Sequence, residues 1–167
     1  MKVLGIAGWS GSGKTTLVTR LLPVLIARGI SVSTVKHAHH QFDVDQQGKD
    51  SFRHREAGAR EVLVSSARRW ALMAELRDHA EPSLSQLLAK LGPVDLVLVE
   101  GFKQEGHDKI EVCRAAADKP PLYPGNASVV AVASDRALPD AGRPVLALDD
   151  LEAIADFIVA HCALERP

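Results

Sequence analysis

A glycine-rich stretch near the N-terminus, residues 8–16 (GWSGSGKTT), has the residue types and spacing that bind phosphate groups. It fits the P-loop pattern G-x-x-x-x-G-K-[ST], with Gly8, Gly13, Lys14 and Thr15 at the fixed positions. Such glycines let backbone N–H groups turn toward phosphate oxygens, and the helix expected to follow directs its positive end at the same anion. Lys14 would neutralise the terminal phosphates, and the Thr15 hydroxyl would ligate Mg²⁺. The residues expected to bind phosphates are Gly11, Ser12, Gly13, Lys14, Thr15 and Thr16.

The alternative interpretation of this stretch is a flexible turn between a strand and a helix, with an exposed lysine. The P-loop interpretation needs a strand before the motif and a helix after it. An apolar run precedes the motif at residues 2–8, and leucines recur at helical spacing after Lys14. The required context is therefore present.

A second acid is expected beside the metal, at the exit of a neighbouring strand, because open α/β sheets bind ligands at the C-terminal ends of their strands. The apolar run VDLVLVEG at residues 94–101 offers two carboxylates. Asp95 lies at the entrance of this strand and Glu100 at its exit. We therefore predict that Glu100 lies on the metal side, where it binds Mg²⁺ through water or orients an attacking water. An acidic loop residue without a partner is the alternative, and Gly101 would let another chain or a ligand approach closely.

The polar segment at residues 36–51 (KHAHHQFDVDQQGKDS) is the second dense group of reactive side chains. One interpretation is a Zn²⁺ or Ni²⁺ site, because imidazole and carboxylate ligands suit both metals; its ligands would be His37, His39, His40 and Asp43. A second is a switch loop, in which Asp43 and Asp45 approach Mg²⁺ while Lys36 and Lys49 meet an anionic substrate. The third is a solvated loop. We predict Asp43 as a metal ligand, Asp45 as a catalytic residue, and His39 and His40 as ligand-binding residues.

The residue that reads the nucleotide base is less clearly marked. The guanine motif Asn-Lys-x-Asp is absent from the sequence, but the apolar run VVAVASD at residues 129–135 ends in Asp135. A carboxylate at this strand exit can accept both N–H groups on the edge of guanine, whereas adenine presents a different pattern. Asp135 is therefore the predicted base-reading residue, and an aspartate capping the next turn is the alternative.

Composition excludes several classes of protein. The 167 residues are 46% hydrophobic and 25% charged, which suits one globular domain, and we expect a single P-loop nucleotide-binding domain over residues 1–167. Lys and Arg number 20 against 21 Asp and Glu, so no global field favours nucleic acid or an anionic membrane. Two distant cysteines, no leader and no apolar run near the roughly 18 residues needed to cross a bilayer predict a reduced, cytoplasmic protein.

Apolar runs alternate with helical patterns along the chain, which is typical of a sheet of parallel strands joined by helices. The expected strands cover residues 2–8, 30–37, 94–101, 109–115 and 128–135, with a further short strand and a helix closing the chain. Helices are expected from about Lys14 to Gly29, interrupted by Pro23, after a capping Ser51, and over residues 83–92. Residues 60–66 and 69–76 would pair as antiparallel strands at one side of the sheet. The predicted fold is α/β: a P-loop NTPase-like, mostly parallel sheet flanked by helices, with an added antiparallel strand pair.

Five segments together resemble one known family. They are AGWSGSGKTTL at residues 7–17, the segment 36–59, RWALM at 69–73, LVLVEGFK at 96–103 and VVAVASD at 129–135. In this order they resemble the molybdopterin-guanine dinucleotide biosynthesis adaptor family, MobB. The resemblance implies a homodimeric P-loop protein that binds GTP with Mg²⁺ and is a weak GTPase at most. It also implies a partner, the molybdenum cofactor guanylyltransferase that joins GMP to molybdopterin.

The resemblance also implies roles for individual residues. The phosphate role falls on residues 11–16 and the metal-side role on Glu100. The His/Asp segment at 36–50 would face the nucleotide or a bound product, molybdopterin or its guanine dinucleotide, and Lys103 would contact a phosphate or the pterin. The loop at residues 115–127 matches no family motif and receives no function. The dimer is expected to form through the strand pair near RWALMAEL.

Two other functions are compatible with the same residues. A small-molecule kinase would use the P-loop to transfer a terminal phosphate to an acceptor held by the His/Asp segment. A metal-delivery GTPase would bind Zn²⁺ or Ni²⁺ at His37, His39 and His40.

Overall fold

The computed structural model describes residues 1–38, 42–117 and 119–165. Contacts within the chain divide it into two compact units. The first unit combines residues 1–37 with residues 84–167, and the second is residues 38–83. No helix in the described ranges is long and apolar enough to cross a membrane.

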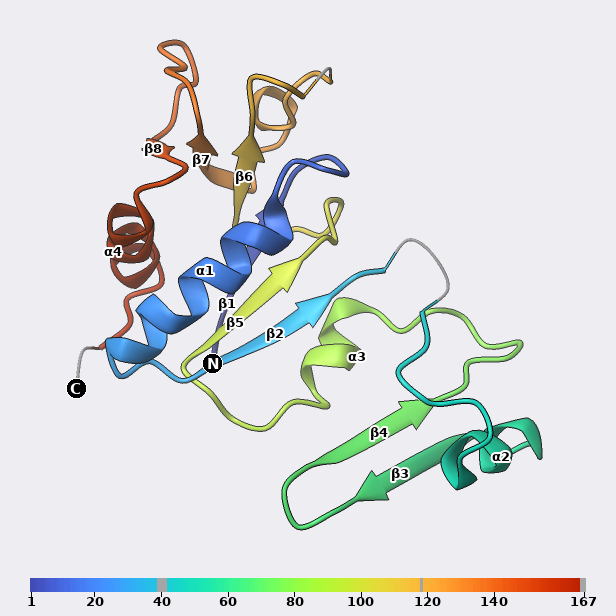
Figure 1. Cartoon of the computed structure of the whole chain (residues 1–167). Coiled ribbons are helices and arrows are strands. Elements are labelled where there is room, and N and C mark those ends of the chain that lie inside the picture. Colours follow the sequence, from blue (N-terminus) through green and yellow to red (C-terminus); the bar gives the residue numbers. More distant parts are fainter. Residues whose placement is uncertain (39–41, 118, 166–167) are drawn as a thin grey trace. The chain divides into compact units, whose positions relative to one another are not determined.

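A six-stranded sheet in which every strand pair is parallel forms the centre of the first unit (Figure 1). The strand order is β2-β5-β1-β6-β7-β8. The strands are β1 (Lys2–Ala7), β2 (Val32–Lys36), β5 (Leu96–Glu100), β6 (Lys109–Cys113), β7 (Val129–Ser134) and β8 (Val145–Ala147). The helical segments of this unit are α1 (Lys14–Ala27), α3 (Leu84–Leu88), the short 3₁₀ turn η1 (Tyr123–Gly125) and α4 (Leu151–His161). The predicted parallel sheet is confirmed.

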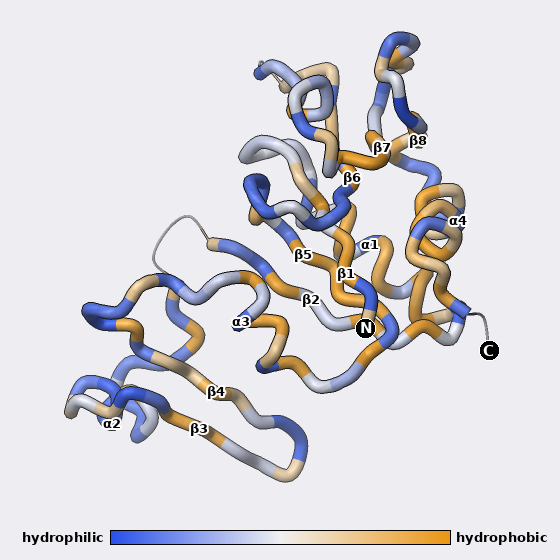
Figure 2. Tube along the Cα trace, turned by 180° about the vertical axis from the view of Figure 1, so that it is seen from behind, coloured by the Kyte–Doolittle hydropathy of each residue, from blue (hydrophilic) through white to orange (hydrophobic). Residues whose placement is uncertain are grey.

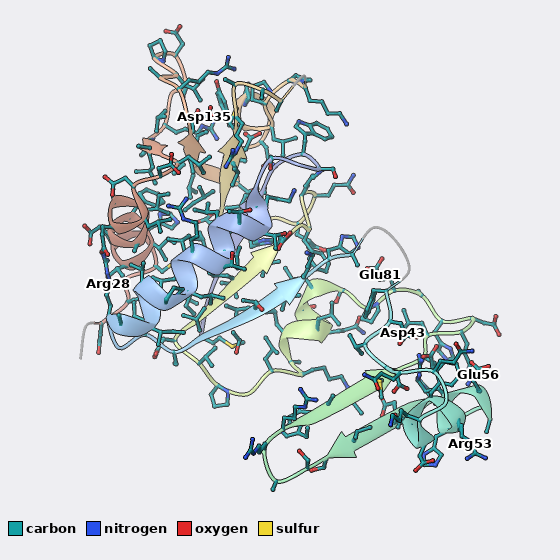
Figure 3. All side chains as sticks on the ribbon, in the orientation of Figure 1. Arg28, Asp43, Arg53, Glu56, Glu81 and Asp135 are labelled. Atoms are coloured by element: carbon teal, nitrogen blue, oxygen red, sulfur yellow. The ribbon has the colours of Figure 1, made fainter. Side chains whose placement is uncertain are left out.

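The inner strands β1, β5, β6 and β7 are mostly buried on both faces. This burial explains the apolar runs of β5 and β7, whose hydropathy is coloured in Figure 2. Successive side chains of a strand point to opposite faces. Leu96 and Leu98 of β5 therefore pack into the core formed with α1 and α4, whereas Val97 and Val99 pack with Leu84 of α3. Surface ion pairs from Arg28 at the end of α1 to Glu152 and Asp156 of α4 accompany the contact between these helices (Figure 3).

The second unit contains α2 (Asp50–Glu56) and a two-stranded antiparallel sheet of β3 (Glu61–Ser65) and β4 (Trp70–Ala74). The predicted antiparallel pairing is confirmed, with Val62 opposite Met73 and Val64 opposite Ala71. Within the described residues, β3 and β4 form a two-stranded sheet of their own and are not strands of the main sheet. Their predicted placement at one side of the main sheet stays a prediction. A tight turn specifies which two strands pair, but it does not specify whether they join a larger sheet.

Three local predictions need correction or refinement. Ser51 does not cap α2: the cap is Lys49, and the Ser51 hydroxyl instead donates to the Asp45 carboxylate at 2.7 Å. The helix predicted at 83–92 ends at Leu88, after which Lys90 and Leu91 make the shorter i to i−3 hydrogen bonds of a tightened turn. Pro23 lies inside α1 without ending it, although its nitrogen has no hydrogen to donate.

Candidate functional site

The candidate site lies at the C-terminal ends of the parallel strands, where one edge of the sheet collects the exits of several strands. The P-loop follows β1, Lys36 and Glu100 end β2 and β5, and Arg114 and Asp135 follow β6 and β7. Because all these strands run in the same direction, their exits meet at one edge. The topology therefore gathers residues that are about 100 positions apart in the sequence.

Two P-loop glycines hold backbone conformations and close contacts that a side chain would disturb. Gly8 has φ 138°, and a Cβ there would lie 2.7 Å from the Ser12 hydroxyl and 2.8 Å from the Val112 carbonyl. Gly13 has φ 94° and caps α1 without any side-chain hydrogen bond. The first N–H groups of α1 thus receive no capping side chain, which leaves them suited to a phosphate.

Thr15 and Glu100, two of the residues predicted to hold a metal ion, lie in contact with each other. The Thr15 hydroxyl donates to a Glu100 carboxylate oxygen at 2.6 Å, and the Lys36 ammonium lies 3.5 Å from the same oxygen. Only 13% of the Glu100 side chain is exposed. Hydroxyl and carboxylate oxygens are the hard ligands that Mg²⁺ prefers, and this ion commonly takes one or two protein ligands together with substrate phosphates. This donor set fits Mg²⁺.

Lys14 lies in a strongly cationic environment. Its ammonium donates to the Trp9 carbonyl at 2.8 Å, within the P-loop. Burial lowers the pKa of Lys14; Glu100 opposes this shift, and the positive charges of Lys103 and Lys36 reinforce it. An incoming phosphate would supply the negative charge that stabilises the protonated form.

The loop after β6, to which the sequence assigned no function, contacts the P-loop through Trp9. The Trp9 indole N–H donates to the Pro120 carbonyl at 2.8 Å. The ammonium groups of Lys103 and Lys119 lie over its ring, at 4.4 Å and 4.9 Å from the ring centroid. Both distances are within the range of cation–π attraction. Lys103, predicted to contact a phosphate or the pterin, therefore lies over the P-loop tryptophan.

Glu111 of β6 holds the far part of this loop. Its buried carboxylate accepts hydrogen bonds from the backbone N–H groups of Leu122 at 2.8 Å and Tyr123 at 2.9 Å. Burial raises the pKa of Glu111, while these two hydrogen bonds and Arg143 oppose the shift. The loop is thus fixed to the strand from which it leaves.

A hollow of about 260 Å³ lies between the P-loop and the loop after β6. Its lining is formed by Trp9, Ser10, Gly11, Ser12, Arg114, Ala116, Ala117 and Lys119. Of these residues, only Gly11 and Ser12 were predicted as site residues, and the aromatic and charged side chains of Trp9, Arg114 and Lys119 were missed. The position of Arg114 directly after a strand exit was the signal that could have identified it.

Asp135 lies beyond the end of β7, at the same edge of the sheet as the P-loop (Figure 3). One of its carboxylate oxygens accepts a hydrogen bond from the Ala115 backbone N–H at 2.8 Å, which joins the exits of β6 and β7. The side chain is exposed. Its predicted role in reading the base stays a prediction.

Asp43 and Asp45 lie in the second unit, where both contact Arg55 (Figure 3 labels Asp43). The Arg55 guanidinium reaches Asp45 at 3.1 Å, Asp43 at 3.2 Å and Glu75 at 2.7 Å. The hydrogen bond from Ser51 is the largest of several contacts that lower the pKa of Asp45, although desolvation opposes them. These contacts favour a structural role for Asp45; its catalytic role and the metal role of Asp43 stay predictions.

His37 is the one histidine of the predicted metal set that the structure describes, because His39 and His40 lie outside the described residues. Its ring stacks on Phe102 with centroids 4.5 Å apart. A Cβ on Gly101 would lie 2.9 Å from the Cβ of His37, so this glycine lets a segment of the same chain approach closely. The approach of another chain or a ligand stays a prediction. Across residues 1–38, 42–117 and 119–165, no three His, Cys, Asp or Glu side chains are grouped to hold a metal ion.

Known proteins are similar to this chain in sequence and in fold. The family model described as molybdopterin guanine dinucleotide synthesis protein B matches residues 3–135. The molybdopterin-guanine dinucleotide biosynthesis adapter protein of Escherichia coli (strain K12) is 45% identical over 160 residues, covering 94% of this chain and 91% of that protein. The adapter protein of the same name from Haemophilus influenzae is 46% identical over 158 residues, covering 93% of this chain and 86% of that protein.

Solved structures agree with this relationship. A crystal structure of molybdopterin-guanine biosynthesis protein B is similar with a TM-score of 0.74 and 30% identity, covering 95% of this chain and 99% of that chain. The MobB protein homolog from Bacillus stearothermophilus is similar with a TM-score of 0.73 and 26% identity, covering 99% and 100%. The predicted P-loop NTPase-like fold is confirmed, and the chain belongs to the family of molybdopterin guanine dinucleotide synthesis protein B.

Proposed function

We propose that this chain is a GTP-binding adaptor in molybdenum cofactor biosynthesis, which assists the guanylyltransferase that attaches GMP to molybdopterin. The relatives that cover most of its length carry the name adapter protein of molybdopterin-guanine dinucleotide biosynthesis. The observation that carries the nucleotide part of the proposal is the P-loop with Thr15 hydrogen-bonded to Glu100 at 2.6 Å.

In this proposal the chain binds a nucleotide and hydrolyses it only weakly. The N–H groups of the P-loop and of the first turn of α1 bind the phosphates, and Lys14 exchanges the Trp9 carbonyl for a phosphate oxygen. Mg²⁺, when bound by Thr15 and Glu100, would neutralise the terminal phosphate. The Glu100 carboxylate already accepts a hydrogen bond from Thr15 and forms an ion pair with Lys36, so it is a poor general base. Hydrolysis is therefore weak.

A nucleotide panel tests this function. GTP, GDP and ATP are titrated with and without Mg²⁺ by calorimetry, and turnover is measured on the same samples. We expect Mg²⁺-dependent GTP binding with little turnover. Rapid transfer of phosphate to a small acceptor would instead support the kinase alternative, and stoichiometric Zn²⁺ or Ni²⁺ binding in equilibrium dialysis would support metal delivery.

Recognition of the base is assigned to Asp135, whose exposed carboxylate lies at the exit of β7. We expect Asp135→Asn to reduce the preference for GTP over ATP about tenfold, because the amide presents a donor where guanine needs an acceptor. The ratio of the two dissociation constants is the measurement. An unchanged ratio would contradict the assignment.

The parts of the proposal that concern partners and product involve the β3–β4 sheet and the His/Asp segment at residues 36–50. The β3–β4 sheet exposes large apolar side chains that a homodimer would cover: Leu63, Val64, Trp70 and Leu72. Light scattering at micromolar concentration tests the dimer, and a monomer would end this assignment. Contact with molybdopterin or its guanine dinucleotide stays a prediction for the His/Asp segment and Lys103. A single domain over residues 1–167 and a cytoplasmic location also stay predictions.

A further inference from the structure

The exit of β6 places a guanidinium group directly against the P-loop. Arg114 follows Cys113, the last residue of β6. Its Nε and Nη2 atoms each lie 3.2 Å from the position that a Cβ on Gly13 would occupy. Gly13 precedes Lys14 and caps α1, so the guanidinium lies against the backbone of the last P-loop glycine.

Within the part of the chain that the structure describes, no carboxylate pairs with this guanidinium. The side chain of Arg114 makes no hydrogen bond or ion pair there, and its Nε is buried without a partner. Arginine keeps its charge at any ordinary pH. A charge held beside the positive end of α1 and near other cations is unfavourable until an anion approaches. An anionic group of a ligand would supply the partner that the described residues lack.

The strand order indicates which part of a nucleotide would lie next to Arg114. Glu100 ends β5 on one side of β1, whereas Arg114 follows β6 on the other side. The terminal phosphate and its metal belong with Thr15 and Glu100, on the β5 side. A phosphate chain lying along the P-loop then has its α-phosphate toward β6, where the hollow lined by Arg114, Trp9 and Lys119 opens.

We propose that Arg114 binds the α-phosphate of the nucleotide and that the hollow beside it receives the attached sugar. This inference rests on the proposed function, because it assigns the nucleoside end of the same ligand. Arginine suits the role, since its planar fork donates two hydrogen bonds to one phosphate. The lining contributes cations and no described carboxylate, which agrees with an anionic occupant.

The test is calorimetric titration of Arg114→Ala with Mg²⁺-GTP and with GDP. Both nucleotides keep the α-phosphate, so both should bind about ten- to a hundredfold more weakly, as expected for loss of a hydrogen bond to a charged group. Loss of GTP affinity and turnover with intact GDP affinity would place Arg114 at the terminal phosphate and overturn the proposal.

Arg20→Ala is the matched control, because it removes the same charge from α1, where Arg20 forms an exposed ion pair with Asp149. It should bind both nucleotides like the wild type; an equal loss in this variant would mean that net charge alone acts, and would overturn the proposal. The melting temperature of nucleotide-free Arg114→Ala should be unchanged or raised, since an unpaired cation is removed. A lowered melting temperature with unchanged GDP affinity would make Arg114 structural and overturn the proposal.

These outcomes are distinct from failure of the proposed function. If wild-type protein binds no GTP, the function and this inference fall together. If wild-type protein binds GTP and Arg114→Ala binds GTP and GDP equally well, only this inference falls.

Discussion

Two clusters of charged side chains in this molecule carry opposite excess charge. Around the P-loop, Lys14 lies near two other ammonium groups, Lys36 and Lys103, and near one carboxylate, Glu100, with which Lys36 forms an ion pair. In the second unit, one cation, Arg55, contacts the three carboxylates of Asp43, Asp45 and Glu75. The first cluster has positive charge left for an anionic ligand, whereas the second keeps more negative than positive charge. The sign of the excess charge, and not the density of charge alone, therefore distinguishes a site that suits phosphate.

The largest expected effect is loss of nucleotide binding in Lys14→Ala. The variant removes the cation that would bind the terminal phosphates, so GTP affinity should fall about a hundredfold or more. The fold should persist, because the side-chain hydrogen bond that Lys14 donates in the described structure goes to the Trp9 carbonyl within the P-loop and not to the core. Calorimetry and a melting curve measure the two properties. Lys90→Ala, an exposed lysine of the same unit, is the control, and GTP affinity retained in Lys14→Ala would refute the phosphate assignment.

Glu100→Gln should affect turnover more than binding. The amide keeps a contact with Thr15 but removes the negative charge beside the metal, so Mg²⁺-dependent hydrolysis should slow about ten- to a hundredfold. Nucleotide affinity should change less. Both are measured across a Mg²⁺ series, with the exposed Glu105→Gln as control. Equal losses of turnover and affinity would indicate a structural role for Glu100 and weaken the comparison.

Arg55→Ala tests the cluster of three carboxylates in the second unit. It leaves three carboxylates without their shared cation, so the melting temperature should fall by a few degrees while GTP affinity stays at the wild-type value. Arg53→Ala, on the same helix but 75% exposed, should change neither property. If GTP binding fell in Arg55→Ala, the second cluster would also belong to the binding function, as the interpretation of a switch loop with Asp43 and Asp45 requires.

The smallest expected effect is a change in acid stability. Hydrogen bonds led by Ser51 lower the pKa of Asp45 in the folded protein. A lowered folded pKa stabilises the protein above the unfolded pKa, about 4, and this contribution is lost as the pH falls through the lower folded value. Asp45→Asn should therefore show a flatter loss of stability below about pH 4 in acid unfolding. The exposed Asp78→Asn should follow the wild type, and an unchanged Asp45→Asn profile would remove Asp45 from the cluster.

Local patterns predicted much of the fold and part of the site. The apolar runs before Gly8 and around Val97 specify buried parallel strands, and the glycine spacing specifies the P-loop, because both signals lie within about ten residues. The choice of Glu100 over Asp95 also follows from strand direction, and Asp95 indeed pairs with Ser31 at the opposite end of β5.

The remaining features depend on contacts between distant segments. The hydrogen bond from Trp9 to Pro120 joins residues 111 positions apart, and no local pattern specifies it. The position of Arg114 after a strand exit marks it as a candidate, but its contact with the P-loop depends on β6 lying next to β1 in the sheet. Likewise, no local pattern indicates that Arg55 contacts the carboxylates of Asp43 and Asp45, whose metal and catalytic roles stay predictions.

The indole of Trp9 gives the P-loop an optical reporter. The chain has two tryptophans, Trp9 and Trp70, so a Trp70→Phe variant would emit from Trp9 alone. The emission of an indole responds to nearby charge, and the ammonium groups of Lys103 and Lys119 lie over this ring. A ligand that draws these lysines toward its phosphates would alter the fluorescence directly. Stopped-flow mixing of unlabelled protein with unlabelled nucleotide would then time the arrival of the phosphates.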